Sequence, residues 1–180
     1  ILDAADSAQG GKRGDSFLWE EAFENVITES DAMIKVLSLS AKVAPSNYTV
    51  LFTGDTGTGK GLLAYSLHRL SPRRDRQFVA LNCAAIPDSL LESELFGHVK
   101  GAFTSADRDR MGLVRQADGG TLFLDEVGKM SLPMQAKLLH FLDSREVRPV
   151  GGNENHKVDV RILCASKRNL KAMVEEDLFL

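Results

Sequence analysis

Two kinds of apolar spacing alternate along most of the chain. Short runs of β-branched, aromatic and other apolar residues, bounded by turn residues, predict buried strands at 48–53, 78–83, 121–124 and 158–165. Apolar residues at helical spacing predict helices at 31–44, 62–70, 89–96 and 131–142, and a last helix that begins at Leu170. Strands that alternate with helices predict an α/β fold with a mainly parallel sheet.

The start of the chain and one long connection depart from this pattern. Residues 1–16 are small, polar and rich in glycine, which predicts a flexible linker or tail before a folded unit at 17–180. Residues 97–110 are glycine-rich, charged and weakly periodic, which predicts an exposed loop. In the first predicted helix, five apolar residues are expected to face a core: Met33, Ile34, Val36, Leu37 and Leu39.

Composition narrows the class of protein. The 180 residues are 43% hydrophobic and 26% charged, which is typical of a soluble globular domain. The net charge of −3 offers no general attraction to polyanions, so no direct DNA binding by this chain is expected. No apolar run approaches the ~20 residues of a membrane span, and no signal peptide is visible. Cys83 and Cys164 lie in apolar runs and are expected to be buried and reduced, which favours a cytoplasmic location.

A glycine-rich loop lies between the first predicted strand and the next predicted helix. It comprises Gly54, Asp55, Thr56, Gly57, Thr58, Gly59 and Lys60, and is followed by Gly61. Glycines let backbone N–H groups point at phosphate oxygens, the helix N-terminus adds its positive dipole end, and Lys60 can reach a phosphate as a point charge. This context predicts a P-loop rather than a glycine turn without a ligand. A dinucleotide-binding loop is not favoured, because the third glycine of GxGxxG is missing.

Two carboxylates, Asp125 and Glu126, end the third predicted strand. The strand delivers them to the carboxyl edge of the sheet, where the P-loop also opens. Asp125 is expected to hold magnesium, and Glu126 is expected to act as a general base on the attacking water. An acidic helix cap is the alternative for this pair by itself, but the P-loop upstream favours the Walker B interpretation.

Longer motifs surround these two. They are the runs Leu81-Asn82-Cys83-Ala84-Ala85-Ile86-Pro87, Glu92 to Ala106, Gly119 to Val127 and Gln135-Ala136-Lys137-Leu138-Leu139. Together, over about residues 17–180, they resemble the AAA+ ATPase domain of sigma-54-dependent bacterial transcription activators. The resemblance implies a P-loop NTPase fold, a three-layer αβα sandwich with a mainly parallel sheet. It also implies that this chain lacks the C-terminal helical lid and that the AAA+ subdomain at 17–180 is incomplete at its C-terminus.

The resemblance also implies an activity and partners. The cofactors are ATP and magnesium, and hydrolysis remodels the sigma-54 RNA polymerase holoenzyme. The family forms hexameric rings, although this fragment alone is expected to be a monomer or dimer.

Individual residues take roles by resemblance. Asn82 is expected to hold and switch Glu126 with nucleotide state, and Lys167 stands at a sensor position. The loop that contacts sigma-54 is expected to be Gly101, Ala102, Phe103, Thr104, Ser105 and Ala106. From its residues alone, Phe103 is expected either to contact a partner or to pack back on its own domain, and the sequence leaves both open.

The chain departs from the family at working positions. Gly61 replaces a usual glutamate, Ser105 a glycine, Lys167 an asparagine and Lys129 an acidic residue, and Leu180 stands where an arginine finger is usual. These departures support an alternative, a nucleotide-binding regulatory or scaffold module that has lost hydrolysis. A small-molecule P-loop kinase is less favoured, because it leaves the sigma-54-type loop unexplained.

One basic turn stands apart from these motifs. Arg73 and Arg74 lie in the run Ser-Pro-Arg-Arg-Asp-Arg and are expected to be solvated, a subunit or nucleic-acid contact being the alternative.

Overall fold

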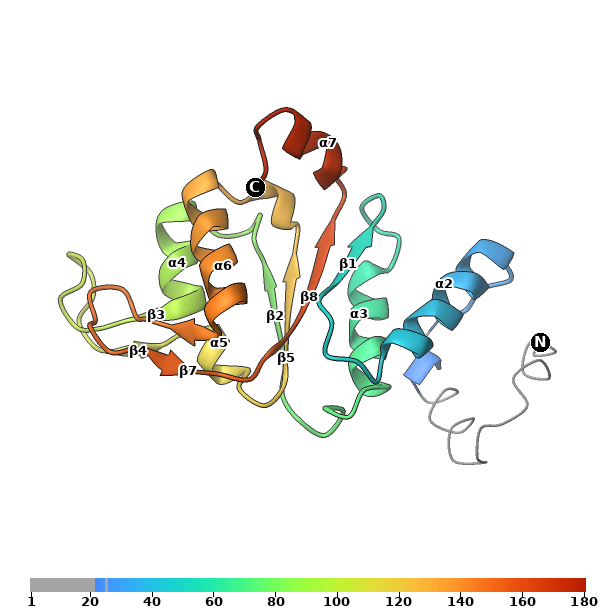
Figure 1. Cartoon of the computed structure of the whole chain (residues 1–180), viewed down its shortest axis with the longest axis horizontal. Helices are drawn as coiled ribbons and strands as arrows, with labels where there is room; N and C mark the ends of the chain where they lie inside the picture. The colour runs from blue at the N-terminus through green and yellow to red at the C-terminus, as the bar shows by residue number, and fades with distance from the viewer. Residues whose placement is uncertain (1–21, 25) are drawn as a thin grey trace.

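A parallel sheet forms the centre of the computed structural model, which describes residues 22–24 and 26–180. Its strand order is β1-β8-β5-β2, so that β8 lies between β1 and β5. The strands are β1 (Val50–Thr53), β2 (Phe78–Asn82), β5 (Thr121–Asp125) and β8 (Arg161–Ser166), all paired in parallel (Figure 1). The four predicted strands are therefore confirmed. The predicted tail at 1–16 and its boundary lie outside the described residues.

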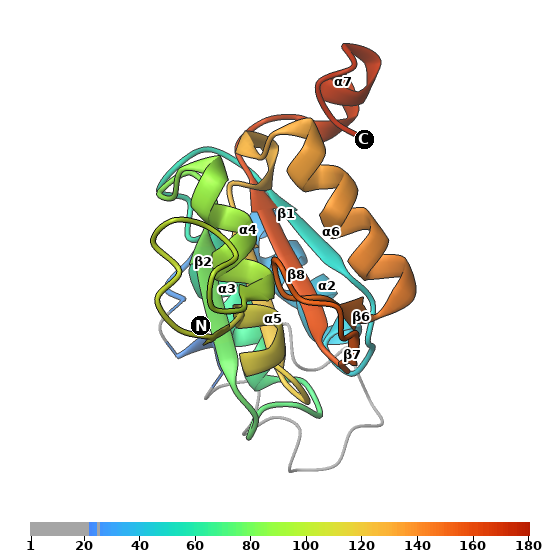
Figure 2. The ribbon, with the colours of Figure 1, turned by 90° about the vertical axis from the view of Figure 1, so that its left-hand side faces the viewer.

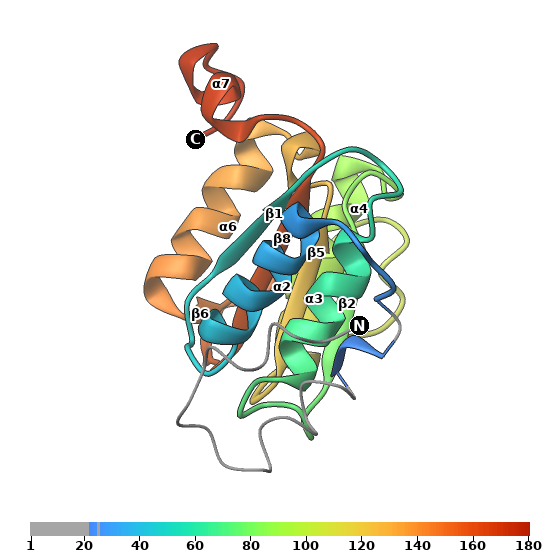
Figure 3. The ribbon, with the colours of Figure 1, turned by 90° about the vertical axis from the view of Figure 1, so that its right-hand side faces the viewer.

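Helices cover both faces of this sheet. One face is covered by α4 (Asp88–Phe96), α5 (Leu113–Gln116) and α6 (Leu132–Ser144), as Figure 2 shows. The other is covered by α2 (Asp31–Val43) and α3 (Lys60–Arg69), as Figure 3 shows. Successive side chains of β5 point to opposite faces of the sheet. Leu122 and Leu124 therefore pack in the core under α4 to α6, and Phe123 packs in the core under α2 and α3. The αβα sandwich is confirmed, and a short 3-10 helix, η1 (Val127–Lys129), and α7 (Leu170–Glu175) follow β5 and β8.

Helix α2 is less buried than its apolar spacing predicts. Leu37 is buried and Met33 packs partly against the same core, but Ile34, Val36 and Leu39 are exposed. Helix α2 lies beside α3 on the same face of the sheet (Figure 3), and only Leu37 and Ser40 of the helix are buried. The expectation that all five apolar residues face a core is therefore wrong for three of them.

The predicted loop at 97–110 has a defined base. Strands β3 (Gly97–His98) and β4 (Arg110–Met111) pair antiparallel, and β6 (Glu146–Val147) and β7 (His156–Lys157) form a neighbouring hairpin. Gly97 adopts a left-handed φ of 82°, and a Cβ atom on Gly112 would lie 2.3 Å from the Gly97 nitrogen. The backbones at the base touch so closely that only glycine fits at these two positions.

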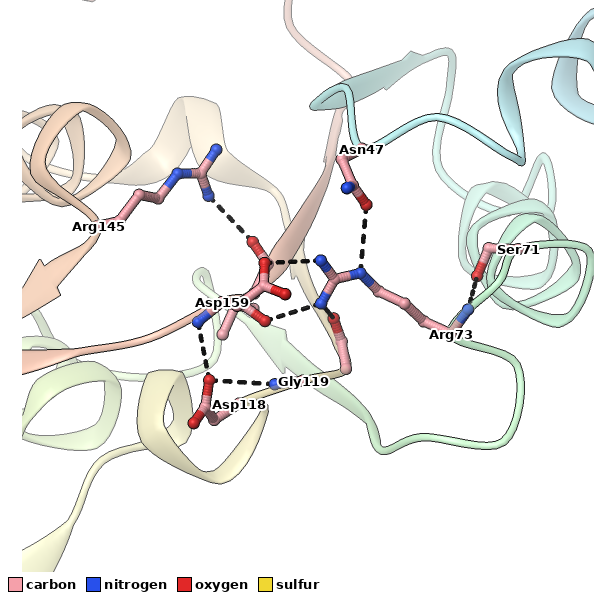
Figure 4. A network of polar contacts seen from close by, with 9 residues as sticks. Asn47, Ser71, Arg73, Asp118, Gly119, Arg145 and Asp159 are labelled. Atoms are coloured by element: carbon pink, nitrogen blue, oxygen red, sulfur yellow. Dashed lines mark hydrogen bonds and ion pairs between the residues drawn. The ribbon is translucent and has the colours of Figure 1, made fainter.

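Arg73 is buried, not solvated, whereas Arg74 is exposed as expected. The Arg73 guanidinium donates to the Asp159 carbonyl and carboxylate, each at 2.7 Å, and to the Asn47 side-chain oxygen at 3.3 Å (Figure 4). Its partners come from distant segments that only the folded sheet brings together. The expectation of a solvated Arg73 is therefore wrong. Its guanidinium links segments that precede the strands at the amino edge of the sheet.

Cys83 matches the prediction of a buried, reduced thiol, whereas Cys164 is reduced but less buried than predicted. Cys83 is buried, Cys164 is half-buried, and both are free thiols. Burial raises the pKa of each thiol to about 12, so both stay protonated at neutral pH. Among the helices of the described residues, none combines the length and apolar character that crossing a membrane requires.

His68 gives the fold an expected pH dependence. The imidazole is buried, its Nδ1 lies 2.9 Å from the Thr121 hydroxyl oxygen, and burial lowers its pKa below the ordinary 6.5. The unfolded chain therefore binds the proton more tightly, and stability is lost as pH falls through about 6.5. Replacing His68 with glutamine is expected to remove a slope of up to about 1.4 kcal/mol per pH unit below that point. Urea unfolding at pH 7 and pH 5.5 measures this, with exposed His140→Gln as the control; an unchanged slope in His68→Gln would contradict it.

Candidate active site

The candidate residues for nucleotide chemistry meet at one edge of the sheet. The glycine-rich loop follows β1, Lys167 follows β8, Asp125 ends β5 and Asn82 ends β2. Because all four strands are parallel, their carboxyl ends share that edge. The structure thus brings together the sites that the sequence predicted on separate strands.

The loop between β1 and α3 wraps around a lysine. Gly57 and Gly59 adopt left-handed φ angles of 85° and 83°, which glycine takes without steric cost. Lys60, the first residue of α3, is buried, and its Nζ donates to the carbonyls of Gly54 at 2.8 Å and Asp55 at 2.7 Å. An ammonium has three donors, so a phosphate oxygen can accept the third.

The rest of the loop is open to a ligand. Residues 55 to 59 are exposed, and the N-terminus of the ten-residue helix α3 opens beside them. The Thr58 hydroxyl donates to the Asp55 carbonyl at 2.8 Å, so it already has a partner within the loop. Gly61 offers no hydroxyl, although a Cβ atom there would lie 3.8 Å from the Phe123 ring, in ordinary contact. The loop can therefore bind phosphates through its backbone and Lys60, without a side-chain metal ligand at position 61.

The acidic pair is held in an unusual backbone conformation. Asp125 is half-buried, and its Oδ1 accepts from the Glu126 backbone N–H at 2.9 Å. Glu126 is left-handed, with φ 55° and ψ 43°, which costs a non-glycine residue about 1 kcal/mol. Its Oε2 is buried and lacks a hydrogen-bond partner among the described residues. A buried carboxylate oxygen without a donor is well suited to accept a proton or a hydrogen bond from water.

Asn82 lies beside this pair but faces its own strand end. It is the register partner of Asp125 in the β2–β5 ladder. Its side-chain oxygen accepts from the Ala84 backbone N–H at 2.9 Å. The expected hold of Asn82 on Glu126 stays a prediction, in which the Asn82 amide nitrogen would donate to the Glu126 carboxylate.

Ser166 is a residue of this edge that sequence reasoning missed. It is fully buried, and its carbonyl accepts from the Gly54 N–H at 3.3 Å. Its hydroxyl accepts from the Arg168 N–H at 3.0 Å and donates to the Arg168 carbonyl at 2.9 Å. Ser166 thus fixes both the start of the glycine-rich loop and the turn that carries exposed Lys167. A small polar residue at the end of an apolar strand is the only signal for it in the sequence.

The segment Gly101–Ala106 lies away from this edge, in the loop that joins β3 to β4. The Gly101 N–H donates to the Ala106 carbonyl at 2.9 Å, which closes the segment on itself. Phe103 is half-buried, and its ring lies edge-to-face on the His98 ring at a centroid distance of 4.9 Å. Of the two expectations for Phe103, this structure shows the ring packed on its own domain. Ser105 has no left-handed φ, so its Cβ causes no backbone strain.

A parallel sheet whose first strand leads into a Gly-Lys loop, and whose neighbouring strands end in paired carboxylates and a polar turn, defines an AAA+ type P-loop NTPase domain. A solved P-loop NTPase domain of a sigma-54 activator from Escherichia coli shares this fold, with a TM-score of 0.56 at 16% identity, covering 86% of this chain and 87% of that one.

Sequence comparison gives the family. The sequence model of the Sigma-54 interaction domain family matches residues 26–180. The chain belongs to that family. It is 48% identical over 166 residues to the transcriptional regulatory protein GlrR of Escherichia coli K12, covering 89% of this chain and 37% of that protein. The solved NtrX of Brucella abortus in complex with ATP matches with a TM-score of 0.78 and 35% identity, over 86% of this chain and 33% of that one. The chain spans about a third of the length of these relatives.

Proposed function

We propose that this chain is an ATP-binding and ATP-hydrolysing module of a sigma-54-interacting transcriptional regulator that remodels the RNA polymerase holoenzyme. The observation that carries ATP binding is the glycine-rich loop closed around buried Lys60, at the N-terminus of α3. The family match and the related NtrX in complex with ATP support the same ligand.

Magnesium fits this edge only together with the nucleotide. Among the described residues, no three His, Cys, Asp or Glu side chains are placed to hold a metal ion by themselves. Asp125 would hold Mg²⁺ jointly with phosphate oxygens and water, as is usual for this ion. Bound there, the ion would neutralise charge that develops on the phosphates.

The chain's own residues would perform the other steps. Lys60 would bind the β- and γ-phosphate oxygens, while the Gly57 and Gly59 backbone lets the loop approach them closely. Glu126 would orient a water molecule and accept its proton on the buried Oε2. Lys167, exposed at the end of β8 between the loop and the acidic pair, would meet the γ-phosphate as a charge.

The partners follow from the same proposal. The segment Gly101–Ala106 would contact sigma-54, after Phe103 leaves the His98 ring. Homo-oligomeric assembly as a hexameric ring would complete each ATP site with residues of a neighbour. The polymerase and not DNA would be the direct partner of this chain, which would place it in the cytoplasm.

A second candidate function is a nucleotide-binding regulatory or scaffold module without hydrolysis. Gly61 offers no hydroxyl, and Lys167 replaces an amide at the sensor position. Both functions require ATP binding and differ only in turnover.

Replacing Lys60 with alanine is expected to weaken ATP binding by about 10- to 100-fold, because one charge-assisted contact to phosphate contributes about 1.5–3 kcal/mol. Titration with a fluorescent ATP analogue in the presence of Mg²⁺ measures the change. Lys42→Ala, an exposed lysine at the end of α2, is the matched control and is expected to bind like the wild type. Equal affinity of Lys60→Ala and wild type would overturn the proposed phosphate role of this loop.

A further inference from the structure

Gln135 links two main-chain segments that are far apart in the sequence. Its side chain is buried in the first turn of α6. The carboxamide Nε2 donates to the carbonyls of Met130 at 2.8 Å and Leu178 at 3.3 Å, while Oε1 accepts from the Leu180 N–H at 2.9 Å. Both donors of the amide and one acceptor site are therefore used by backbone groups.

The contacts with Leu178 and Leu180 follow the pattern of a parallel β-ladder. In such a ladder one residue donates to the carbonyl before its partner residue and accepts from the N–H after it. The Gln135 amide makes this pair of bonds around Phe179. Because only backbone groups take part, the side chain sets the path of the chain at 178–180 whatever residues stand there.

The other end of the link lies beside the acidic pair. Met130 directly follows η1, which begins after Glu126. The same turn packs on α7, since a Cβ atom on Gly128 would lie 3.1 Å from Leu170 Cδ2 and 3.4 Å from Met173 Sδ. The Met173 carbonyl in turn accepts from the Leu178 N–H at 2.8 Å. Two routes therefore connect the turn after Glu126 to residues 178–180, one through α7 and one through Gln135.

We infer that Gln135 is a positioning residue that couples nucleotide occupancy at the acidic pair to the placement of residues 178–180. A bound γ-phosphate and its water would engage Glu126 and shift the turn that ends at Met130. The amide would pass that shift to residues 178–180, because its nitrogen bonds the carbonyls of both Met130 and Leu178 while its oxygen bonds Leu180. The coupling rests on the proposed function, whereas the positioning of Leu180 by Gln135 does not require a nucleotide.

Amide hydrogen exchange measured by NMR on the 180-residue chain tests both parts. In Gln135→Leu the Leu180 amide is expected to exchange about tenfold faster than in the wild type, because its acceptor is lost. The Leu178 amide, bonded to Met173, is expected to change less than threefold and serves as an internal control. Gln135→Glu keeps the acceptor for Leu180 but sets a carboxylate against two carbonyls, so an intermediate rate is expected. Gln116→Leu, which removes a single bond to the Met111 carbonyl, is the matched control.

Addition of Mg²⁺ and a non-hydrolysable ATP analogue then tests the coupling. The wild type is expected to change its Leu180 exchange rate, whereas Gln135→Leu binds the analogue within threefold of the wild type and shows no change at Leu180. A structural role alone would lower the melting temperature without uncoupling Leu180 from the nucleotide. Unaltered Leu180 exchange in Gln135→Leu overturns the positioning, and an equal nucleotide response in both proteins overturns the coupling. If the wild type fails to bind the analogue, the proposed function and the coupling fall together, and the nucleotide-free comparison still decides the positioning.

Discussion

Replacing Glu126 with glutamine is expected to lower ATP hydrolysis by about 10²- to 10⁴-fold while ATP binding stays within a few-fold, because general-base catalysis contributes about that much. Glutamine keeps the size of the side chain and removes the charge that accepts the proton. The buried Oε2, which lacks a partner among the described residues, is the atom affected. Phosphate release by the wild type and by Glu126→Gln, with magnesium and saturating ATP, measures the difference.

The same assay of phosphate release is also run over a range of protein concentrations. Hydrolysis per chain is expected to rise with concentration if a neighbouring copy completes the site. Glu94→Gln is the control, because this carboxylate lies on α4 and pairs with Arg110 at the base of the loop at 97–110. Binding of ATP by both proteins without phosphate release at high concentration would reject hydrolysis and leave the regulatory or scaffold module.

The sequence predicts the parts of this fold that depend on local spacing. The four strands and the main helices follow from apolar periodicity, and parallel connections place the loop at 54–60 and Asp125 at one edge. Here the chemistry is carried by residues at strand ends, so knowing the strands is enough to place the site.

Buried polar residues could not be predicted in the same way. Arg73 looks solvated in its basic turn, but Asn47 and Asp159 bring it partners from distant segments. Gln135 occupies an ordinary helical position until Leu178 and Leu180 return beside it. The burial of these polar residues depends on tertiary neighbours and not on local pattern. The apolar residues of α2 that stay exposed show the opposite: their spacing predicts burial, but no element among the described residues covers them.

Arg161 shows how much such a buried polar residue can matter. Its side chain is 1% exposed, and its guanidinium donates to the carbonyls of Ala44 and Val43, at 2.6 Å and 3.1 Å, where α2 ends. Burial lowers its pKa to about 10, with a smaller contribution from the charge of Arg73. Its Nε lacks a partner among the described residues. The arginine thus joins the first residue of β8 to the negative end of the α2 dipole.

Two opposing effects decide what its removal does. Replacing Arg161 with methionine leaves the Ala44 carbonyl without a donor, at about 1–3 kcal/mol, whereas the Val43 carbonyl keeps the Ser46 N–H and hydroxyl as donors. Removing a buried charge offsets part of that loss of stability, because desolvation of an ion is unfavourable. Because the charge sits at a helix C-terminus and is the donor to the Ala44 carbonyl, we expect a net loss of about 2 kcal/mol in the free energy of unfolding. Urea unfolding at pH 7 measures it, and the melting temperature should fall by about 4–8 °C.

Two further variants separate geometry from charge. Arg161→Lys keeps the charge but cannot span both carbonyls with a planar fork, so a loss of about half that of Arg161→Met is expected. Arg74→Met, at an exposed arginine 3.6 Å from the Asp75 carboxylate, is expected to stay within about 0.5 kcal/mol of the wild type. A methionine variant as stable as the wild type would mean that the desolvation of the guanidinium cancels the gain from its two hydrogen bonds. Arg161 would then hold α2 in place at no net gain in stability, and its effect would have to be sought in the position of α2 beside the P-loop helix.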